Sequence, residues 1–403
     1  MPRSVSRIER TNGKVKHGFD KSTRLDKIRA NGNQLEESFM DRRSFLKQGL
    51  TVSVGLALGG LPKLAGLARA EEAKWRTFEV ITRIEIADSV GAARTWVPVP
   101  LMSNTNYFKR EPDTWSGNYK TVRQVSVDNV GTGLVFAEWP VSEKSPNLEI
   151  KSRFMTQDRS IDLSEKPNPA IKENKTVLDY FRKPSKFIRT DGIVATTSKQ
   201  IVSGYKNDVD KSRAIYEWIV DNTFRDPKVK GCGIGDITTM LESGYLGGKC
   251  ADLNALYVGL ARAAGLPARD VYGVRVANSA EFKSLGRADD ITGAQHCRAE
   301  VYLNGYGWVP VDPADVRKVV LEENLPGAQL ALDDPKVKRA REKLFGQWEM
   351  NWLPYNYSHD VKLPQSRGPE IAYLMYPQGE TANGRKDSLD SKSFSYSIKS
   401  KEV

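Results

Sequence analysis

Apolar and polar residues alternate with a period of two in the first part of the chain beyond residue 75. Runs rich in Val, Ile, Thr and aromatic residues, separated by Gly, Asn, Pro and Ser, span residues 78–86, 94–97, 121–127, 134–141 and 148–154. Short strands at this spacing are typical of a β-sandwich. We therefore predict a β-sandwich-like N-terminal domain over residues 75–165. This segment has no His or Cys, which favours a structural or substrate-docking role over a catalytic one.

The period changes to three and four residues farther along the chain, which predicts helices. One helix over residues 208–222 has Asp208 or Asp210 as its expected cap. A second helix begins at Cys250 and ends before Gly265, a residue suited to the left-handed position after a last turn. Both have an apolar face, so each is expected to pack on a core.

Strands are predicted after the Cys250 helix, over residues 270–276, 296–303 and 306–311. Past residue 315 we predict one further helix over 336–345, with Asp334 as its cap and Pro335 at its first position. Two strand-like runs in the tail, 371–376 and 394–398, are expected to pack back on one of the domains. The pattern thus predicts an α+β protein that ends in a C-terminal helix and strands over residues 321–403.

The charge of the chain is concentrated at its N-terminal end. The formal net charge is +11, but residues 1–70 alone hold 14 Lys and Arg against 6 Asp and Glu. The remaining 47 basic and 44 acidic residues leave a net charge of only +3. No cluster of basic residues interleaved with aromatics follows, so we expect no nucleic-acid binding. A hydrophobic content of 39% is ample for packed cores.

The basic front end resembles an export address. Residues 41–47, DRRSFLK, are similar to a twin-arginine signal, and the apolar run after them is too short to span a bilayer. Ala68-Arg69-Ala70 then offers a cleavage site, so a mature protein would begin near Glu71 in the periplasm, without a membrane span. The twin-arginine export machinery would be a partner. Residues 1–39 are polar and irregular, and we expect Met40 to be the true start, with 40–70 as the signal peptide.

A cysteine at the start of a helix is placed for nucleophilic chemistry. The positive end of the helix dipole favours the Cys250 thiolate, and the glycine-rich loop at 231–235 is expected to approach this helix. His296 opens a strand, and Asp312 ends the next one. A histidine can take and return the thiol proton, and a carboxylate can orient the imidazole. Cys250, His296 and Asp312 are therefore the candidate catalytic residues.

The turn at Asn304-Gly305 decides whether the last two candidates meet. A strict two-residue turn would place Asp312 opposite Cys297, on the wrong face of the hairpin. A three-residue turn or a bulge brings it to the face of His296, and we predict that arrangement. Should Asp312 face away, Glu300 is the alternative carboxylate.

Fewer sequence signals support the candidates for the remaining roles. The Cys250 N–H is one expected oxyanion donor, and Tyr245, Gln295 and Trp308 are candidates for a second donor or for substrate binding. His359 lies in a polar stretch and is expected at the surface, or at most at the rim of a cleft. With three histidines in the chain and no paired ligand spacing, we expect no metal and no cofactor. Cys297 is expected in the core, and whether it pairs with Cys232 in a disulfide is open.

Two stretches resemble the transglutaminase-like superfamily: GGKCADLNALYVGLARAAGLPARDVYGVRV and QHCRAEVYLNGYGWVPVDPAD. The resemblance implies a papain-like α+β core over residues 190–320, with Cys250, His296 and Asp312 at the positions of the nucleophile, the histidine and the aspartate. Arg298 departs from the family, which often has an aromatic residue there. The implied function is an exported cysteine enzyme acting on amide bonds of a protein or peptide through a thioester, by acyl transfer or hydrolysis. The alternative is a non-catalytic binding module on the same fold.

Overall fold

The period-two segments become strands in the computed structural model, which describes residues 74–403 apart from 88, 102, 129 and 325–326. They are β1 (Arg76–Glu85), β2 (Ala93–Pro98), β3 (Phe108–Arg110), β4 (Thr114–Gly117), β5 (Thr121–Ser126), β6 (Gly133–Trp139) and β7 (Asn147–Thr156). The short strands β3 and β4 were not expected from the sequence. Our predictions for Met40, the export signal and the cleavage site at Ala68–Ala70 lie outside the described residues.

These strands divide between two sheets that face each other. In β1 the buried side chains of Phe78, Val80 and Ile84 are two or four positions apart and therefore lie on one face of the strand, as the alternation predicts. Burying an apolar side chain of this size contributes roughly 1.5–3 kcal/mol. The buried cluster between the sheets consists of Ile84, Ile86, Ala93, Val97, Val99, Val135, Ala137, Trp139, Leu148, Ile150 and Phe394.

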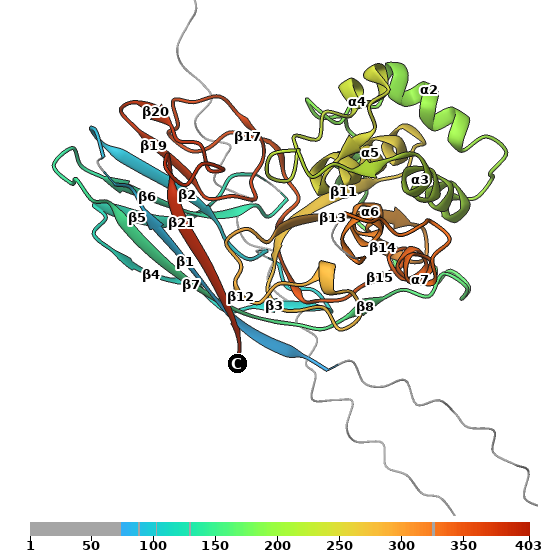
Figure 1. The fold of residues 1–403 in the computed structure, drawn as a ribbon, viewed down its shortest axis with the longest axis horizontal. Helices are drawn as coiled ribbons and strands as arrows, with labels where there is room; N and C mark the ends of the chain where they lie inside the picture. Colours follow the sequence, from blue (N-terminus) through green and yellow to red (C-terminus); the bar gives the residue numbers. More distant parts are fainter. Residues whose placement is uncertain (1–73, 88, 102, 129, 325–326) are drawn as a thin grey trace, which may run out of the picture. The chain divides into compact units, whose positions relative to one another are not determined.

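The tail of the chain completes both sheets. It supplies β19 (Gln378–Thr381), β20 (Gly384–Arg385) and β21 (Ser395–Glu402). The short strand β12 (Asp289–Asp290) pairs with β21. The sheet orders are β12-β21-β1-β7-β3, with β4 also on β7, and β20-β19-β2-β6-β5. Strand β21 runs antiparallel along β1, with Ile398 opposite Thr82 (Figure 1). Two strands that are more than 300 residues apart in the sequence therefore share one hydrogen-bonded ladder.

A third sheet carries the segment around Cys250. Its order is β14-β13-β11-β16, from β14 (Gly307–Val311), β13 (Gln295–Leu303), β11 (Ala268–Arg275) and β16 (Trp352–Asn356). Helices α3 (Asp208–Asn222), α5 (Cys250–Ala263) and α6 (Pro313–Glu322) pack beside it (Figure 1). The predicted α+β fold is confirmed.

Shorter elements fill the connections. The helical ones are α1 (Lys175–Tyr180), α2 (Gly192–Ile201), α4 (Ile237–Ser243), η1 (Lys283–Leu285) and α7 (Pro335–Lys343). The short strands are β8 (Arg159–Ser160), β9 (Phe224–Arg225), β10 (Gly247–Gly248), β15 (Gln347–Trp348), β17 (His359–Val361) and β18 (Ile371–Tyr373). No helix among the described residues is long and apolar enough to cross a membrane.

Helix caps show where sequence reasoning succeeded and where it missed. Asp334 caps α7 as predicted, its side chain accepting from the Lys336 N–H. The cap of α3 is Asn207 and not one of the two aspartates that we expected. Helix α6 was not predicted, although Asp312 followed by Pro313 is the same cap-and-proline signature that predicted α7.

Helix α5 is held at both ends. At its start, the Asp252 carboxylate accepts hydrogen bonds from the N–H groups of Lys249 (3.0 Å), Ile234 (3.0 Å) and Gly235 (2.9 Å). The glycine-rich loop therefore does approach this helix, as predicted. At its end, Gly265 adopts a φ of 88° and closes the last turn.

Gly233 lies in the loop that contacts the start of α5, and Gly265 lies just after the end of this helix. The two glycines give a matched test of what holds α5 in place. Gly233 has a φ of 94°, and a Cβ there would lie 1.9 Å from an Asp252 carboxylate oxygen. Gly265 also has a positive φ, but a Cβ there meets nothing within 4 Å. We expect Gly265→Ala to lower the free energy of unfolding by about 1 kcal/mol from backbone strain alone. Gly233→Ala should cost roughly 3 kcal/mol, because it also breaks the Asp252 cap.

Denaturant unfolding of both variants checks this expectation. Equal destabilisation would mean that the contact between the loop and Asp252 does not contribute to holding α5.

Candidate active site

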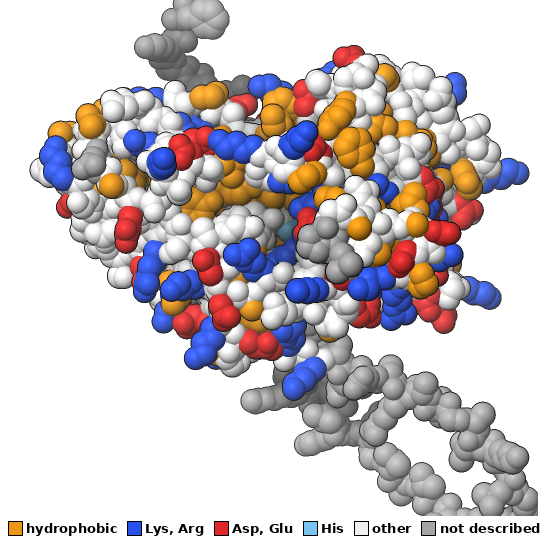
Figure 2. Space-filling view, in the orientation of Figure 1, with side chains coloured by type: hydrophobic (Ala, Val, Ile, Leu, Met, Phe, Trp, Pro, Cys, Tyr) orange, Lys and Arg blue, Asp and Glu red, His pale blue; other side chains and the backbone are white. Residues whose placement is uncertain are grey.

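The start of α5 opens into a cavity of about 590 Å³. Cys250, Cys232, Gln295 and His296 line it together with residues from α6, the loop around η1 and the C-terminal tail. Figure 2 shows the hollow in this face of the molecule, with Lys and Arg side chains gathered around it. Cys250 is only 3% exposed, so a reagent reaches its sulfur through this cavity.

The hairpin of β13 and β14 brings Asp312 to the face of His296. Leu303 pairs with Gly307, which leaves a three-residue turn, and Gly305 in that turn has a φ of 82°. Continuing this register puts Asp312 level with Arg298, two residues from His296 on the same face. The predicted three-residue turn is confirmed, and the alternative that paired Asp312 with Cys297 is excluded.

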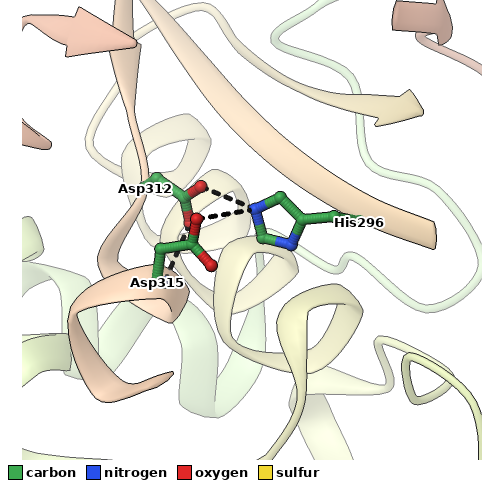
Figure 3. A group of neighbouring side chains, drawn as sticks. All are labelled: His296, Asp312 and Asp315. Atoms are coloured by element: carbon green, nitrogen blue, oxygen red, sulfur yellow. Dashed lines mark hydrogen bonds and ion pairs between the residues drawn. The ribbon is translucent and has the colours of Figure 1, made fainter. Parts of the chain in front are cut away.

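Two carboxylates meet one nitrogen of the His296 ring. Nε2 lies 2.8 Å from Asp312 Oδ2 and 3.2 Å from Asp315 Oδ2 (Figure 3). Burial and the nearby Arg275 oppose protonation of the ring, but Asp315 and Asp312 outweigh them and raise the pKa of His296 to about 10. The imidazole is therefore held as a cation at neutral pH.

Asp315 is a functional candidate that sequence reasoning missed. It stands three residues after Asp312 on α6, and its N–H donates to Asp312 Oδ1 at 3.1 Å. Although burial opposes its charge, Arg275 and then His296 hold the pKa of the Asp315 carboxyl far below its usual range. Burial and the Asp315 charge raise the pKa of Asp312. Recognising α6 in the sequence would have placed both carboxylates on one helical turn.

The two carboxylates are supported from behind by buried polar groups. Arg275 on β11 contacts Asp315 Oδ1 at 2.6 Å, and Arg298 on β13 lies 3.6 Å from Asp312 Oδ2. Asn254 on α5 donates to Asp312 Oδ1 at 3.2 Å and to the Cys297 carbonyl at 2.8 Å. Arg298, the departure from the family pattern, thus takes a charge-balancing position beneath the site.

The Cys250 sulfur has three polar neighbours. Hydrogen bonds from Cys232 and Cys297 lower the pKa of Cys250, burial opposes them, and His296 adds a hydrogen bond and its positive charge, leaving the pKa well below its usual range. The Cys232 thiol also donates to the Gln295 carbonyl at 3.3 Å. One S–H proton cannot serve both acceptors, so we rank the His296 charge above Cys232 as support for the thiolate. All three cysteines are free and buried.

The arrangement favours a thiolate on Cys250, because His296 lies beside it and the positive end of a helix points at it. A thiolate is the nucleophilic form of cysteine, and the imidazolium is a proton donor beside it. Because Asp312 and Asp315 engage Nε2, the other ring nitrogen is the one left to face the sulfur. The chemistry available is nucleophilic attack followed by proton transfer.

His296, Asp312 and Asp315 also form a group of donors close enough to hold a metal ion, all within 4.8 Å of one another. The charges around them disfavour this use. Arg275 and Arg298 already balance the two carboxylates, and a divalent cation would have to displace the proton between the imidazole and Asp312. The group fits an ion-pair network better than a metal centre.

The structure does not bring all the remaining candidates together. Gln295 lines the cavity, and its buried side-chain nitrogen has no hydrogen-bond partner among the described residues. Tyr245 is exposed and donates to Asp226 Oδ2 at 2.9 Å, and Trp308 donates to Glu173 at 2.9 Å; neither lines the cavity. Glu300, the alternative carboxylate, is buried between Arg159 and Arg269 and away from the cavity.

His359 does not lie on the open surface but is partly buried among the residues that line a small pocket. Its side chain is only 12% exposed and lies on β17, with Nε2 3.3 Å from the buried carboxylate of Asp270. The pairing of β17 with β18 covers a residue that looked polar and peripheral in sequence.

Comparison with known proteins assigns the family. The profile of the transglutaminase-like superfamily matches residues 195–313, which include Cys250, His296 and Asp312. An uncharacterized protein of Haemophilus influenzae is 34% identical over 331 residues, covering 78% of this chain and 88% of that protein. The chain therefore carries a transglutaminase-like domain and belongs to one family with the Haemophilus protein.

Two solved structures are similar to this chain at lower identity. A protein from Cytophaga hutchinsonii, described as "a Putative Cysteine Protease", is 16% identical with a TM-score of 0.46, covering 82% of this chain and 99% of that one. The periplasmic domain of TgpA from Pseudomonas aeruginosa is 12% identical with a TM-score of 0.31, covering 64% of this chain and 98% of that one.

The thiolate and imidazolium pair predicts a pH profile. We expect iodoacetamide to alkylate Cys250 with an apparent pKa well below the ordinary thiol value of about 8.5. His296→Ala removes the positive charge and should raise the pKa of Cys250 toward that value. Asp315→Asn should raise it by less, because Asp312 still supports the charged ring. The measurement is the alkylation rate as a function of pH, mapped to each cysteine by peptide analysis.

Cys232 and Cys297 are the internal controls, because the contact with Cys250 and burial raise the pKa of Cys232, and burial and the same contact raise that of Cys297. Rapid alkylation of either one under the same conditions, or a Cys250 profile indifferent to His296→Ala, would contradict the proposed ion pair.

Proposed function

We propose that the protein is a cysteine enzyme that cleaves or exchanges amide bonds of a protein or peptide through a thioester. One observation carries the proposal: a cysteine with a lowered pKa lies at a helix start beside a histidine that two carboxylates keep charged, within a cavity. The transglutaminase-like domain supports the same reading. In this proposal Cys250 is the nucleophile, His296 the acid and base, and Asp312 the orienting carboxylate.

In the first half-reaction, the Cys250 thiolate attacks the amide carbonyl carbon and forms a carbon–sulfur bond. The electron pair of the carbonyl moves to oxygen, giving a tetrahedral oxyanion. As this intermediate collapses, the carbon–nitrogen bond breaks, and the His296 imidazolium gives its proton to the departing amine. The products are a free amine and a thioester on Cys250, with His296 neutral.

In the second half-reaction, neutral His296 takes a proton from a water molecule or an acceptor amine as that molecule attacks the thioester. The new tetrahedral intermediate expels the Cys250 thiolate, and the imidazolium is restored. Water yields hydrolysis, and an amine yields transamidation. Asp312 and Asp315 favour the charged ring at the end of the cycle, because both approach Nε2.

Two donors are available for the oxyanion. The Cys250 N–H belongs to the first turn of α5, where no carbonyl one turn back in the helix can accept it. Gln295 borders the same cavity, and its side-chain nitrogen is without a hydrogen-bond partner among the described residues. Loss of one such donor costs roughly 3–4 kcal/mol of transition-state stabilisation in other enzymes. We assign these two groups to the oxyanion hole in place of Tyr245 and Trp308.

Trapping of an acyl-enzyme tests the proposed reaction. We expect a peptide thioester or activated ester to add its acyl group to Cys250, visible as a mass increase on that residue. Cys250→Ala should abolish the adduct, because the nucleophilic sulfur is gone. His296→Gln should slow its formation by at least about a hundredfold through loss of acid–base catalysis. Lys175→Gln, which changes an exposed side chain that does not line the cavity, is the matched control.

A fold-competent protein whose Cys250 never becomes acylated would instead support the alternative, a peptide-binding module on the same fold. Binding of peptides by Cys250→Ala and wild type with equal affinity, without turnover, would be its signature.

We also propose that the protein is exported in its folded form by the twin-arginine route. The support is the sequence of residues 41–47, the apolar run after it and Ala68-Arg69-Ala70. We expect the mature N-terminus at or near Glu71 in the periplasmic fraction. The double change Arg42→Lys and Arg43→Lys should retain the precursor in the cytoplasm, because the export machinery recognises this signal by its paired arginines.

Cell fractionation with N-terminal sequencing checks the route. Unchanged export of the double variant would exclude the twin-arginine pathway, and precursor peptides from residues 2–39 would show that Met40 is not the start.

A further inference from the structure

Five basic side chains line the cavity beside Cys250 in addition to Arg275. These five, which we call the cationic wall, are Arg225, Lys249, Lys283, Arg287 and Lys318. They come from four different places: β9, the residue before α5, the loop around η1 and helix α6. Glu322 is the one acidic residue among the described residues that line the cavity. The cationic wall therefore carries a local excess of positive charge next to the nucleophile.

Direct ion pairs within the protein balance only part of this excess. Arg225 Nε lies 2.7 Å from Glu322 Oε1, and Lys318 contacts the other oxygen of the same carboxylate. One negative charge thus serves two cations. Within the described part of the chain, Lys249, Lys283 and Arg287 have no carboxylate at ion-pair distance. A cavity with unpaired positive charge attracts an anion and focuses its approach.

Lys318 is the most constrained of these cations. Its side chain is 15% exposed on α6, one helical turn beyond Asp315. Burial, followed by Arg225 and Arg275, lowers the pKa of Lys318 to about 7. A buried amine held among other cations gains more from a bound carboxylate than an exposed lysine does. This site is pre-arranged for an anionic group.

The part of the cavity lining that comes from the C-terminal tail is largely apolar and aromatic. Tyr376, Leu389, Phe394 and Tyr396 reach the cavity from the C-terminal tail. Leu389 is 40% exposed although it is apolar. An apolar side chain of a ligand would pack against these tail residues, and a negatively charged side chain would bind the cationic wall.

We propose that the cavity selects acidic peptides, in which carboxylates flank the amide that Cys250 attacks, and that Lys318, Arg225 and Lys249 bind these carboxylates. The inference rests on the proposed function, because it names the substrate class of the same site. An anion seated on the cationic wall would lie beside the sulfur and would restore the charge balance that Glu322 alone leaves incomplete.

Two small alkylating reagents test this selection without knowledge of the substrate. Iodoacetate is an anion, and iodoacetamide is its neutral counterpart of nearly equal size. We define the selection ratio as the alkylation rate of Cys250 by iodoacetate divided by that by iodoacetamide. The His296 imidazolium attracts iodoacetate in every variant, so the comparison is between variants. We expect the triple change Arg225→Gln, Lys249→Gln and Lys318→Gln to lower the ratio at least about fivefold.

The matched control is Lys175→Gln, which removes an exposed lysine of α1 that does not line the cavity. It should leave the ratio unchanged. Added salt should lower the ratio of the wild type more than that of the triple variant, because salt screens charges in a solvent-filled cavity.

A second measurement uses peptide thioesters that differ only in Glu or Gln next to the acyl group. The wild type should acylate faster with the Glu peptide, and single Lys318→Gln should bring the ratio of the Glu rate to the Gln rate close to one, whereas Lys175→Gln should keep the wild-type ratio.

The outcomes separate the two proposals. Fast alkylation by iodoacetamide with an unchanged ratio in the triple variant would overturn acidic-peptide selection and leave the nucleophile intact. A Cys250 that reacts slowly with both reagents would overturn the proposed function and this inference with it.

Discussion

Two buried carboxylates that share one imidazole nitrogen are the constraint around which this protein is built. Asp312 and Asp315 would repel each other in an apolar interior without a cation between them, and His296 supplies it. Each carboxylate then needs a second partner, which Arg275 and Arg298 provide from neighbouring strands. The network therefore requires β11, β13 and α6 in fixed positions. It also keeps the ring charged, and the charged ring stabilises the Cys250 thiolate.

Helix α5 is tied to this network at several points. Asn254 joins it to both Asp312 and the backbone of β13, and the Asp252 carboxylate joins its first turn to the loop that holds Cys232. The sulfur is thus placed by hydrogen bonds on both sides of the helix start. The C-terminal tail then contributes part of the cavity lining, and its last strand, β21, is held in place by pairing with β1.

Local sequence signals pointed to Cys250, His296 and one of the two carboxylates, Asp312, as candidates. Cys250 was visible because an apolar helical period begins there, and the strand at His296 because its residues alternate. Asp315 was not identified as a candidate because α6 was not predicted, and without that helix the sequence does not place Asp315 near Asp312. The basic residues of the cationic wall are scattered from 225 to 318, and nothing local marks them as neighbours. Trp308 and Tyr245 were plausible by residue type, and their orientation excludes them from the cavity.

The sequence by itself determined the α+β class, most of the central strands and both ends of α5, and it predicted a three-residue turn or a bulge before Asp312 without excluding the two-residue turn. These follow from hydrophobic period, caps and glycine, which act over a few residues. Only the tertiary structure decided that the tail completes both sandwich sheets, that Glu300 joins buried ion pairs, that His359 lies beside the buried Asp270 carboxylate, and that cations from four segments line one cavity. Such contacts depend on long-range pairing and on the balance of buried charge, which no short window of sequence contains.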